Sequence, residues 1–175
     1  MGNICSMATT TDTVSIETAV ALTDRSRSTW WRHMSEGKVT RVGDDARGRA
    51  LLAWTDVAPE VTVPMDAEEV ALVFGADVGD ADAQNNLGQV FLRADKCKAA
   101  LYWLRQAADK DNADAMHWLA HCYFNGKGVP QDNNLGTMWL AKAAAHGHVI
   151  AQAQMHGLIG NTLSESPPTT TAKRE

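Results

Sequence analysis

The sequence has little of what several large classes of protein need. It contains three cysteines and no C-x-x-C pair, which fits a reducing compartment and disfavours a disulfide scaffold. No stretch approaches the ~18 consecutive apolar residues of a membrane span. A basic stretch followed by an apolar core is missing from the N-terminus, so we expect no signal peptide. These features favour a cytoplasmic protein.

Motifs of catalysis and cofactor binding are also missing. The sequence has no G-x-G-x-x-G, phosphate-binding loop or nucleophile elbow, and its carboxylates form no pair that spacing singles out. His117 and His121 stand four residues apart, but H-W-L-A-H lacks the glutamate of the zinc-protease motif. We therefore predict no enzymatic activity, no cofactor and no metal site.

Charge is distributed unevenly along the chain. Residues 1–52 contain seven Lys/Arg and six Asp/Glu, whereas residues 53–175 contain nine and fifteen. A nearly neutral front with clustered arginines, joined to an acidic rear, indicates two functional parts.

What the sequence does contain is an internal repeat between residues 81 and 147. Ala83 and Phe91 return as Ala115 and Tyr123, a shift of 32 residues. A fixed period of this length is typical of a helical repeat array, which buries its core between neighbouring repeats and presents extended binding surfaces. We predict helices near residues 67–77, 80–93, 96–109, 112–125, 133–146 and 148–159, with Asp80 and Asn112 as N-caps of the second and fourth.

The repeat resembles a known family. The pattern A-x-A-x-x-x-L-G/A-x-x-Y/F, then G-x-G-V, then A-x-x-W-x-x-x-A-A is similar to the Sel-one-like repeat, a relative of the tetratricopeptide repeat. Residues 113–147 fit it most fully, although Gly136 stands where the family prefers alanine. The copy from Ala81 lacks G-x-G-V. The resemblance implies an αα-superhelical solenoid with a role in protein interaction.

The phase of the repeats predicts which side chains are buried and which bind a partner. Trp103 and its equivalent Trp139 should fill the wedge between hairpins, whereas Trp118 should be exposed. Positions opposite the apolar stripe, together with the aromatic anchor Trp118, should contact a protein or peptide partner. These residues are Asn85, Gln89, His117, Trp118 and His121. The alternative is an ordinary solvated helix face.

The front of the chain follows a different pattern. A short helical stretch from Ile16 to Leu22, with Ser15 as its N-cap, precedes a turn and a second helix capped by Ser26 and closed by Gly37. Strand candidates at residues 38–42 and 49–52 flank a glycine-containing loop, and Trp54 begins a third short helix.

This order, and the S-R-x-T-x-x-R-like helix, resemble the winged helix-turn-helix of excisionase-like and MerR-type domains. The resemblance implies binding of double-stranded DNA, with the second helix in the major groove and the wing on phosphates or in the minor groove. The expected contacts are Arg27, Ser28, Thr29, Arg32, Lys38, Arg41, Arg47 and Arg49. Asp44 and Asp45 would face phosphates, and only one ring of Trp30–Trp31 can point inward. A docking or dimerisation role for the domain therefore stays open.

The sequence thus predicts a mainly α protein with four segments. These are a disordered N-terminus at 1–13, a winged helix-turn-helix domain with a short β-hairpin at 14–60, a repeat array at 65–160 and a disordered tail at 161–175. The predicted function is that of a transcriptional or DNA-associated regulator that binds a protein partner and no membrane. The alternative is a pure protein–protein adaptor. The partner, the DNA sequence and the oligomeric state stay open.

Overall fold

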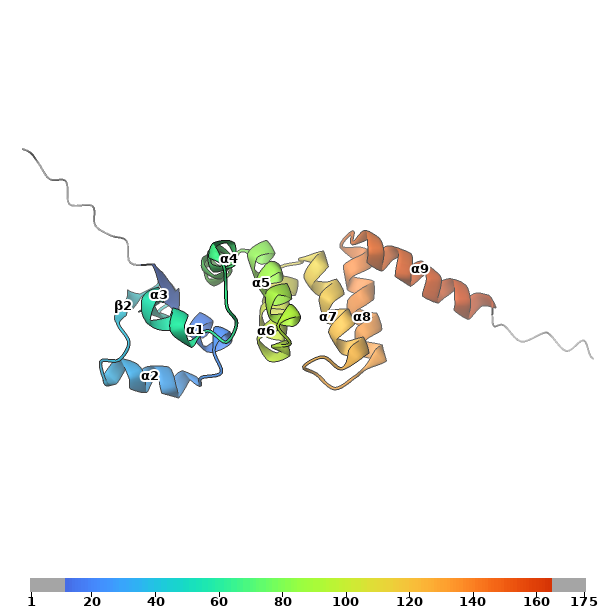
Figure 1. The fold of residues 1–175 in the computed structure, drawn as a ribbon. Coiled ribbons are helices and arrows are strands. Elements are labelled where there is room, and N and C mark those ends of the chain that lie inside the picture. The colour runs from blue at the N-terminus through green and yellow to red at the C-terminus, as the bar shows by residue number, and fades with distance from the viewer. Residues whose placement is uncertain (1–11, 165–175) are drawn as a thin grey trace, which may run out of the picture. The chain divides into compact units, whose positions relative to one another are not determined.

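The computed structural model describes residues 12–164, with side chains described as far as residue 158. The fold is mainly α-helical with one small sheet (Figure 1), and it divides into two compact units, residues 1–103 and 104–175. In the first unit the elements are β1 (Thr13–Ser15), α1 (Ile16–Leu22), α2 (Arg27–Ser35), β2 (Arg41–Asp44), β3 (Ala50–Ala53), α3 (Trp54–Val57), the 3-10 helix η1 (Ala58–Glu60), α4 (Ala67–Val78) and α5 (Ala81–Arg93). They are followed by α6 (Cys97–Ala108), within which the boundary between the units falls, and by α7 (Ala113–Asn125), α8 (Asn133–Ala145) and α9 (Val149–Ser164).

The repeat helices begin and end within a few residues of the predicted ranges, because their signals are local. The side chains of Asp80 and Asn112 accept hydrogen bonds from the backbone N–H three residues on, which caps α5 and α7 as predicted. In the turn after α7, Gly126 and Gly128 have φ of +64° and +73°, the left-handed geometry that favours glycine.

The front of the first unit is built on a three-stranded antiparallel sheet. The strand order is β1-β3-β2, with Val14 opposite Leu52 and a register shift between Arg41 and Gly43. Strands β2 and β3 lie close to the two predicted strands. Strand β1 was not predicted, because its three residues are too few to show the alternation typical of a strand.

Capping residues define the two helices beside this sheet. Ser15 accepts a hydrogen bond from the backbone of Thr18, and Ser26 accepts one from Thr29, so both predicted N-caps are confirmed. After α2, Gly37 has a φ of +69°, as expected for the residue that ends a helix.

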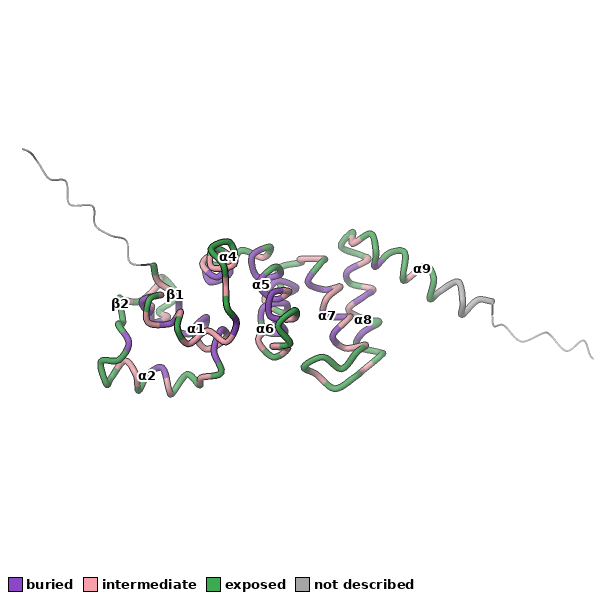
Figure 2. Tube along the Cα trace, in the orientation of Figure 1, coloured by how far each residue is buried: buried purple, intermediate pink, exposed green. Residues whose placement is uncertain are grey.

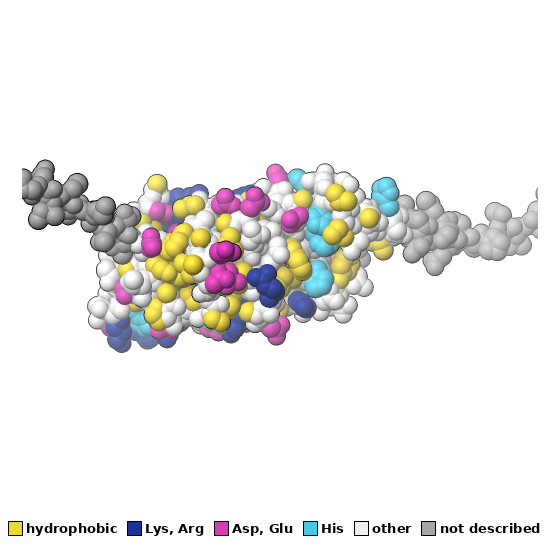
Figure 3. Space-filling view, turned by 45° about the horizontal axis from the view of Figure 1, so that its top comes forward, with side chains coloured by type: hydrophobic (Ala, Val, Ile, Leu, Met, Phe, Trp, Pro, Cys, Tyr) yellow, Lys and Arg dark blue, Asp and Glu magenta, His cyan; other side chains and the backbone are white. Residues whose placement is uncertain are grey.

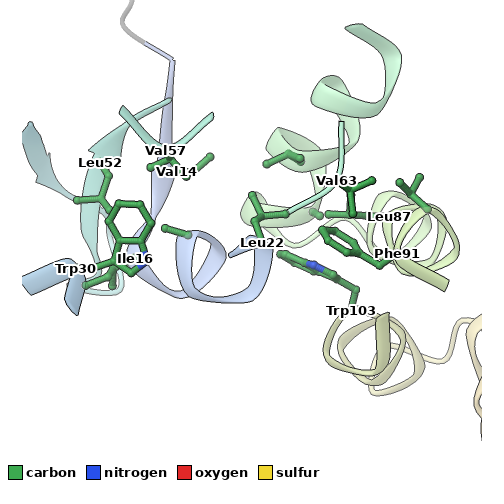
Figure 4. Packing of buried hydrophobic residues seen from close by; sticks show 14 of the residues in the cluster. Val14, Ile16, Leu22, Trp30, Leu52, Val57, Val63, Leu87, Phe91 and Trp103 are labelled. Atoms are coloured by element: carbon green, nitrogen blue, oxygen red, sulfur yellow. The ribbon is translucent and has the colours of Figure 1, made fainter. Parts of the chain in front are cut away.

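One hydrophobic cluster fills the first unit. The rings and side chains of Trp30, Ile16 and Leu52 lie together beneath the sheet (Figure 4), and all three are fully buried. The same cluster includes residues of the first repeat, where Figure 4 shows Trp103 beside Leu22 and Phe91. The domain boundary expected between residues 60 and 65 stays a prediction.

A buried carboxylate also fastens α4 to the front of this unit. The side-chain hydroxyls of Ser15 and Thr18 donate to Asp77, and the backbone N–H of Ser15 donates to it over 3.1 Å. Arg49 places a guanidinium nitrogen 3.5 Å from the same carboxylate. Because charged partners strengthen hydrogen bonds, this network is a strong local restraint.

The two wedge tryptophans differ, and the prediction that Trp139 is buried is wrong. Trp103 is 1% exposed, packed in the cluster that also holds Leu22 and Val63. Trp139 is only half-buried, and the ammonium of Lys142 lies 4.5 Å from its ring centroid. The segments that contain Leu22 and Val63 precede the repeats and occur only once in the chain. Trp103 and Trp139 therefore hold equivalent positions in their repeats but are not buried to the same extent.

The ends of the chain differ slightly from the expected disordered segments. Thr13 is already part of β1, and α9 continues through Ser164, four residues into the expected tail. The helix passes Gly160 and Asn161, the local signal for a helix end, and the next proline is Pro167. The rest of both segments, residues 1–11 and 165–175, lies outside the described residues.

Candidate functional site

The outer face of α2 carries the first set of predicted site residues. Trp30 is buried in the core, while Arg27, Ser28 and Arg32 of the same helix are exposed. Trp31, the second ring of the tandem pair, is 44% exposed, which confirms that only one ring faces inward. Lys38, Arg41 and Arg47 are also exposed, on the segment after α2, on β2 and in the loop of the hairpin.

Carboxylates accompany most of these cations. Arg27 pairs with Glu17 over 2.7 Å, and Lys38 pairs with Glu36 over 2.7 Å. The hydrogen bond from Lys38 holds the pKa of the Glu36 carboxyl below its ordinary value, and the charge of Arg32 acts in the same direction. A polyanion on this face would have to displace the acidic partners.

Arg41 and Arg49 have specific partners within the hairpin. Arg41 donates to both carboxylate oxygens of Asp44 over 2.7 Å, and its guanidinium lies 5.9 Å from the centroid of the Trp31 ring. Arg49 pairs with Asp45 over 2.6 Å and also reaches Asp77, and its side chain is 23% exposed. The structure therefore gives Arg49 a role in holding β3 against α4.

Thr29, another predicted DNA contact, is also less accessible than expected. It is half-buried, its backbone N–H is bonded by the Ser26 cap, and its hydroxyl lies 2.9 Å from the Ser26 hydroxyl. Thr29 thus helps to start α2.

The five predicted protein-contact residues fall in both units. Asn85 and Gln89 belong to the first unit and His117, Trp118 and His121 to the second, so each set stands by itself.

In the first unit, the prediction that Asn85 faces outward is wrong. It is 4% exposed, because α5 is buried on more than one side and Gln84 and Asn85 lie inside together with Ala83. Gln89 is half-buried and lines a polar cavity of about 470 Å³ with residues that include Glu68 and Arg93.

In the second unit the structure does bring the predicted residues together. The Trp118 ring meets His117 and His121 edge-on, with centroid distances of 6.2 and 5.8 Å. All three side chains are half-buried, so the prediction of an exposed Trp118 is wrong. Figure 3 shows histidine side chains among hydrophobic ones over the C-terminal part of the array.

Beside these histidines lies a hydrophobic groove that we call the α7–α9 groove. It encloses about 360 Å³. Its walls come from α7, α8 and α9, and it is lined by His117, Ala120, His121, Phe124, Leu140, Gln154, Gly157 and Leu158. Figure 2 shows these three helices, with buried stretches along α7 and α8 and mostly exposed residues in the part of α9 up to residue 158. Among residues 12–158, no charged side chain lines the groove, so it suits an apolar group.

The two imidazoles that line the groove, those of His117 and His121, both have lowered pKa values. Burial lowers the pKa of His117, and the stacked ring of His148, 4.3 Å away between centroids, lowers it further. Burial also lowers the pKa of His121, followed by the charge of Lys127. Both groove imidazoles are therefore neutral near pH 7.

His148 has a separate structural role at the start of α9. Its Nδ1 accepts a hydrogen bond from the backbone N–H of Ala151 over 3.0 Å, and its Nε2 lies 3.4 Å from Asp114. The ring that stacks on His117 is therefore fixed from both sides.

Gly136 explains how the aromatic wall of the groove fits. A Cβ at this position would lie 2.6 Å from two ring carbons of Phe124, so the ring packs directly on the backbone of α8. The glycine that departs from the family preference thus makes room for Phe124.

The sequence analysis found two groove residues, His117 and His121, and missed the rest. Repeat phase alone does not pair Phe124 with Gly136 or identify Gln154 and Leu158. A usable signal existed in α9, which contains no Asp, Glu, Lys or Arg from Val149 to Ser164. A helix without charged residues normally has a covered face.

Comparisons with known proteins agree with the repeat architecture. A helical array of this kind belongs to the α-solenoid class of interaction scaffolds. Residues 81–112 and 113–148 match the Sel1 repeat family, which confirms the resemblance of this part of the chain to Sel1 repeats. They correspond to α5–α6 and α7–α8. A search of curated proteins gives no match.

Among solved structures, the chain is similar to a Sel1 repeat protein from Oxalobacter formigenes. The two are 31% identical over 53% of this chain, with a TM-score of 0.48. The match spans 28% of the length of that protein.

None of the helices described is long and apolar enough to cross a membrane. Within the same part of the chain, no three His, Cys, Asp or Glu side chains are grouped so as to hold a metal ion.

Proposed function

We propose that this protein is a non-enzymatic regulator that binds a protein segment in the α7–α9 groove and double-stranded DNA through its front part. The observation that carries the first half is the groove itself. It is concave, uncharged and mostly apolar, with a few polar groups, which is the usual composition of a binding pocket. Most of its lining residues lie within residues 113–148, which match a family of protein-interaction repeats.

A matched pair of variants on α9 tests the groove. Leu158 lines it and is 46% exposed, whereas Val149 is 75% exposed and is not among its lining residues. Leu158→Asp should abolish capture of the partner, and Val149→Asp should leave it intact, because both add one carboxylate to an exposed apolar site. The readout is quantitative affinity purification from the native cell, with nuclease added to remove bridging by DNA. Equal retention of every protein by both variants would refute the groove.

The exposed face of α2 supports the second half of the proposal. Arg27, Ser28 and Arg32 are exposed on a helix that precedes a β-hairpin, an order similar to winged helix-turn-helix domains. Because carboxylates already pair with several of the cations, we expect only a few net phosphate contacts and a modest salt dependence.

Fluorescence anisotropy of labelled duplexes at increasing salt tests DNA binding. The double variant Arg27→Glu, Arg32→Glu should lose binding, whereas Arg93→Glu should keep it. Arg93 is a suitable control because it is also exposed and also pairs with a glutamate, Glu69, over 3.5 Å. If no duplex binds even at low salt, the proposal that this protein binds DNA is refuted.

A docking or dimerisation role of the front part is the second candidate. The observation that favours it is Trp31, a large ring that is 44% exposed on the same helix. Exposed aromatic rings are frequent anchors of protein interfaces. If the chain does not bind DNA but forms a dimer that Trp31→Ser disrupts in sedimentation experiments, the adaptor function is the correct one.

A further inference from the structure

We infer that the partner segment in the α7–α9 groove is apolar and flanked by acidic residues, with a hydrophobic side chain in the cavity and a carboxylate beside Lys127. The inference rests on the proposed protein-binding function of this groove and names the chemistry of its occupant.

The apolar part of the occupant follows from the lining. Phe124, Leu140 and Leu158 supply large hydrophobic walls around about 360 Å³. This volume lies near the lower end of the ~300–1,000 Å³ typical of ligand pockets. It therefore suits one or two side chains of a peptide better than a large cofactor.

The acidic part follows from the cations around the groove. Lys127 is exposed in the turn after α7, and its charge is felt by the groove residue His121. It forms no ion pair with any of the described residues 12–158. The cation of α8, Lys142, lies over the Trp139 ring instead. A carboxylate on the partner would complement Lys127.

A polar atom of the groove residue His121 supports the same chemistry. Its Nδ1 is buried and has no hydrogen-bond partner among the described residues. Buried polar atoms normally have a partner, so an unpaired one needs an explanation. An acidic group beside Lys127 favours the protonated imidazole, and a bound segment brings new hydrogen-bonding groups to this wall of the groove.

The test uses the full chain and an array of synthetic heptapeptides. Each peptide has a central Phe-Leu pair flanked by Glu, Lys or Ser in every combination, and binding is quantified by fluorescence anisotropy. We expect Glu-flanked peptides to bind roughly tenfold more tightly than Lys-flanked ones at low salt, with the difference shrinking as salt increases.

Charge variants locate the acidic contact. Lys127→Glu should remove the preference for Glu flanks, whereas Lys98→Glu should retain it. Lys98 is an exposed lysine of α6 that is not among the groove-lining residues. Leu158→Asp should lower the affinity for every peptide of the array, because all of them contain the Phe-Leu pair.

Each other outcome overturns the inference in a distinguishable way. Equal binding of Glu- and Lys-flanked peptides, or equal effects of Lys127→Glu and Lys98→Glu, would refute the acidic flank and leave the groove as a protein-binding site. If Leu158→Asp leaves the affinity for every peptide unchanged, the peptides bind outside the α7–α9 groove. If no peptide in the array binds while Leu158→Asp still loses a protein in the purification, the groove binds a protein whose contact segment is not an apolar stretch with acidic flanks.

Discussion

Replacing Gly136 by alanine should destabilise the protein, although alanine is the residue that the family prefers at this position. A Cβ there would stand 2.6 Å from two carbons of the Phe124 ring. Contacts this short do not occur in relaxed structures, so the ring or the helix must move. Since the ring lines the groove, the displaced ring would enter the space that we assign to a partner side chain.

Two opposing effects determine the size of the change. Alanine inside a helix is favoured over glycine by about 0.5–1 kcal/mol, because glycine loses more backbone entropy. Overpacking a filled site costs about 1–3 kcal/mol. The net change in the free energy of unfolding should therefore be a loss of up to about 2.5 kcal/mol, and of about 1 kcal/mol at the middle of both ranges. For a chain of this length, each kcal/mol lowers Tm by about 2–4 °C.

Gly157→Ala is the matched control for this prediction. Gly157 lies inside α9, and a Cβ there would meet nothing within 4 Å. Only the propensity effect remains, so this variant should be stabilised by about 0.5–1 kcal/mol. Urea denaturation followed by circular dichroism measures both. If Gly136→Ala stabilises the protein as much as Gly157→Ala does, the ring of Phe124 does not pack on α8 and the geometry of the groove is wrong.

Three further predictions follow from the described contacts. Asp77→Ala removes the carboxylate that accepts the hydrogen bonds of a buried network. It should lower the free energy of unfolding, measured by urea denaturation, by about 3–5 kcal/mol. A loss below about 1 kcal/mol would show that the network contributes little to stability. The pKa values of His117 and His121 are lowered in the folded state, so the unfolded chain binds more protons once the pH drops below the ordinary value of about 6.5. The free energy of unfolding should therefore fall as the pH drops below that value. Replacing both histidines by Gln should flatten this dependence in melting curves recorded at several pH values. Trp30→Ala should cost about 3–5 kcal/mol and Trp31→Ala under about 1 kcal/mol, because the first ring is fully buried and the second is 44% exposed; equal Tm shifts would contradict this.

Features fixed by local chemistry were predictable from the sequence. The N-caps Ser15, Ser26, Asp80 and Asn112 start helices as predicted, because a capping side chain bonds a backbone N–H two or three residues away. The ends of the repeat helices follow for the same reason.

Features that depend on distant partners were not predictable. Arg49 looked like a cation of an exposed loop, yet it reaches the carboxylate of Asp77, 28 residues further along the chain. Asn85 has the same repeat phase as His117 but is buried, because α5 has more neighbours than the phase of a single helix reveals. A repeat pattern specifies the conformation of the backbone, whereas the surroundings of each copy depend on what lies next to it.

The differences between the two copies are therefore more informative about function than their shared pattern. Four positions of the second repeat that differ from the first are His117, His121, Phe124 and Gly136, where the first has Asn85, Gln89, Leu92 and Ala100. Three of the four line the α7–α9 groove, and the fourth is the glycine on which the Phe124 ring packs. The copies differ at other positions too, but the groove of the second copy needs these four. They supply its two imidazoles, its aromatic wall and the space in which that aromatic ring packs.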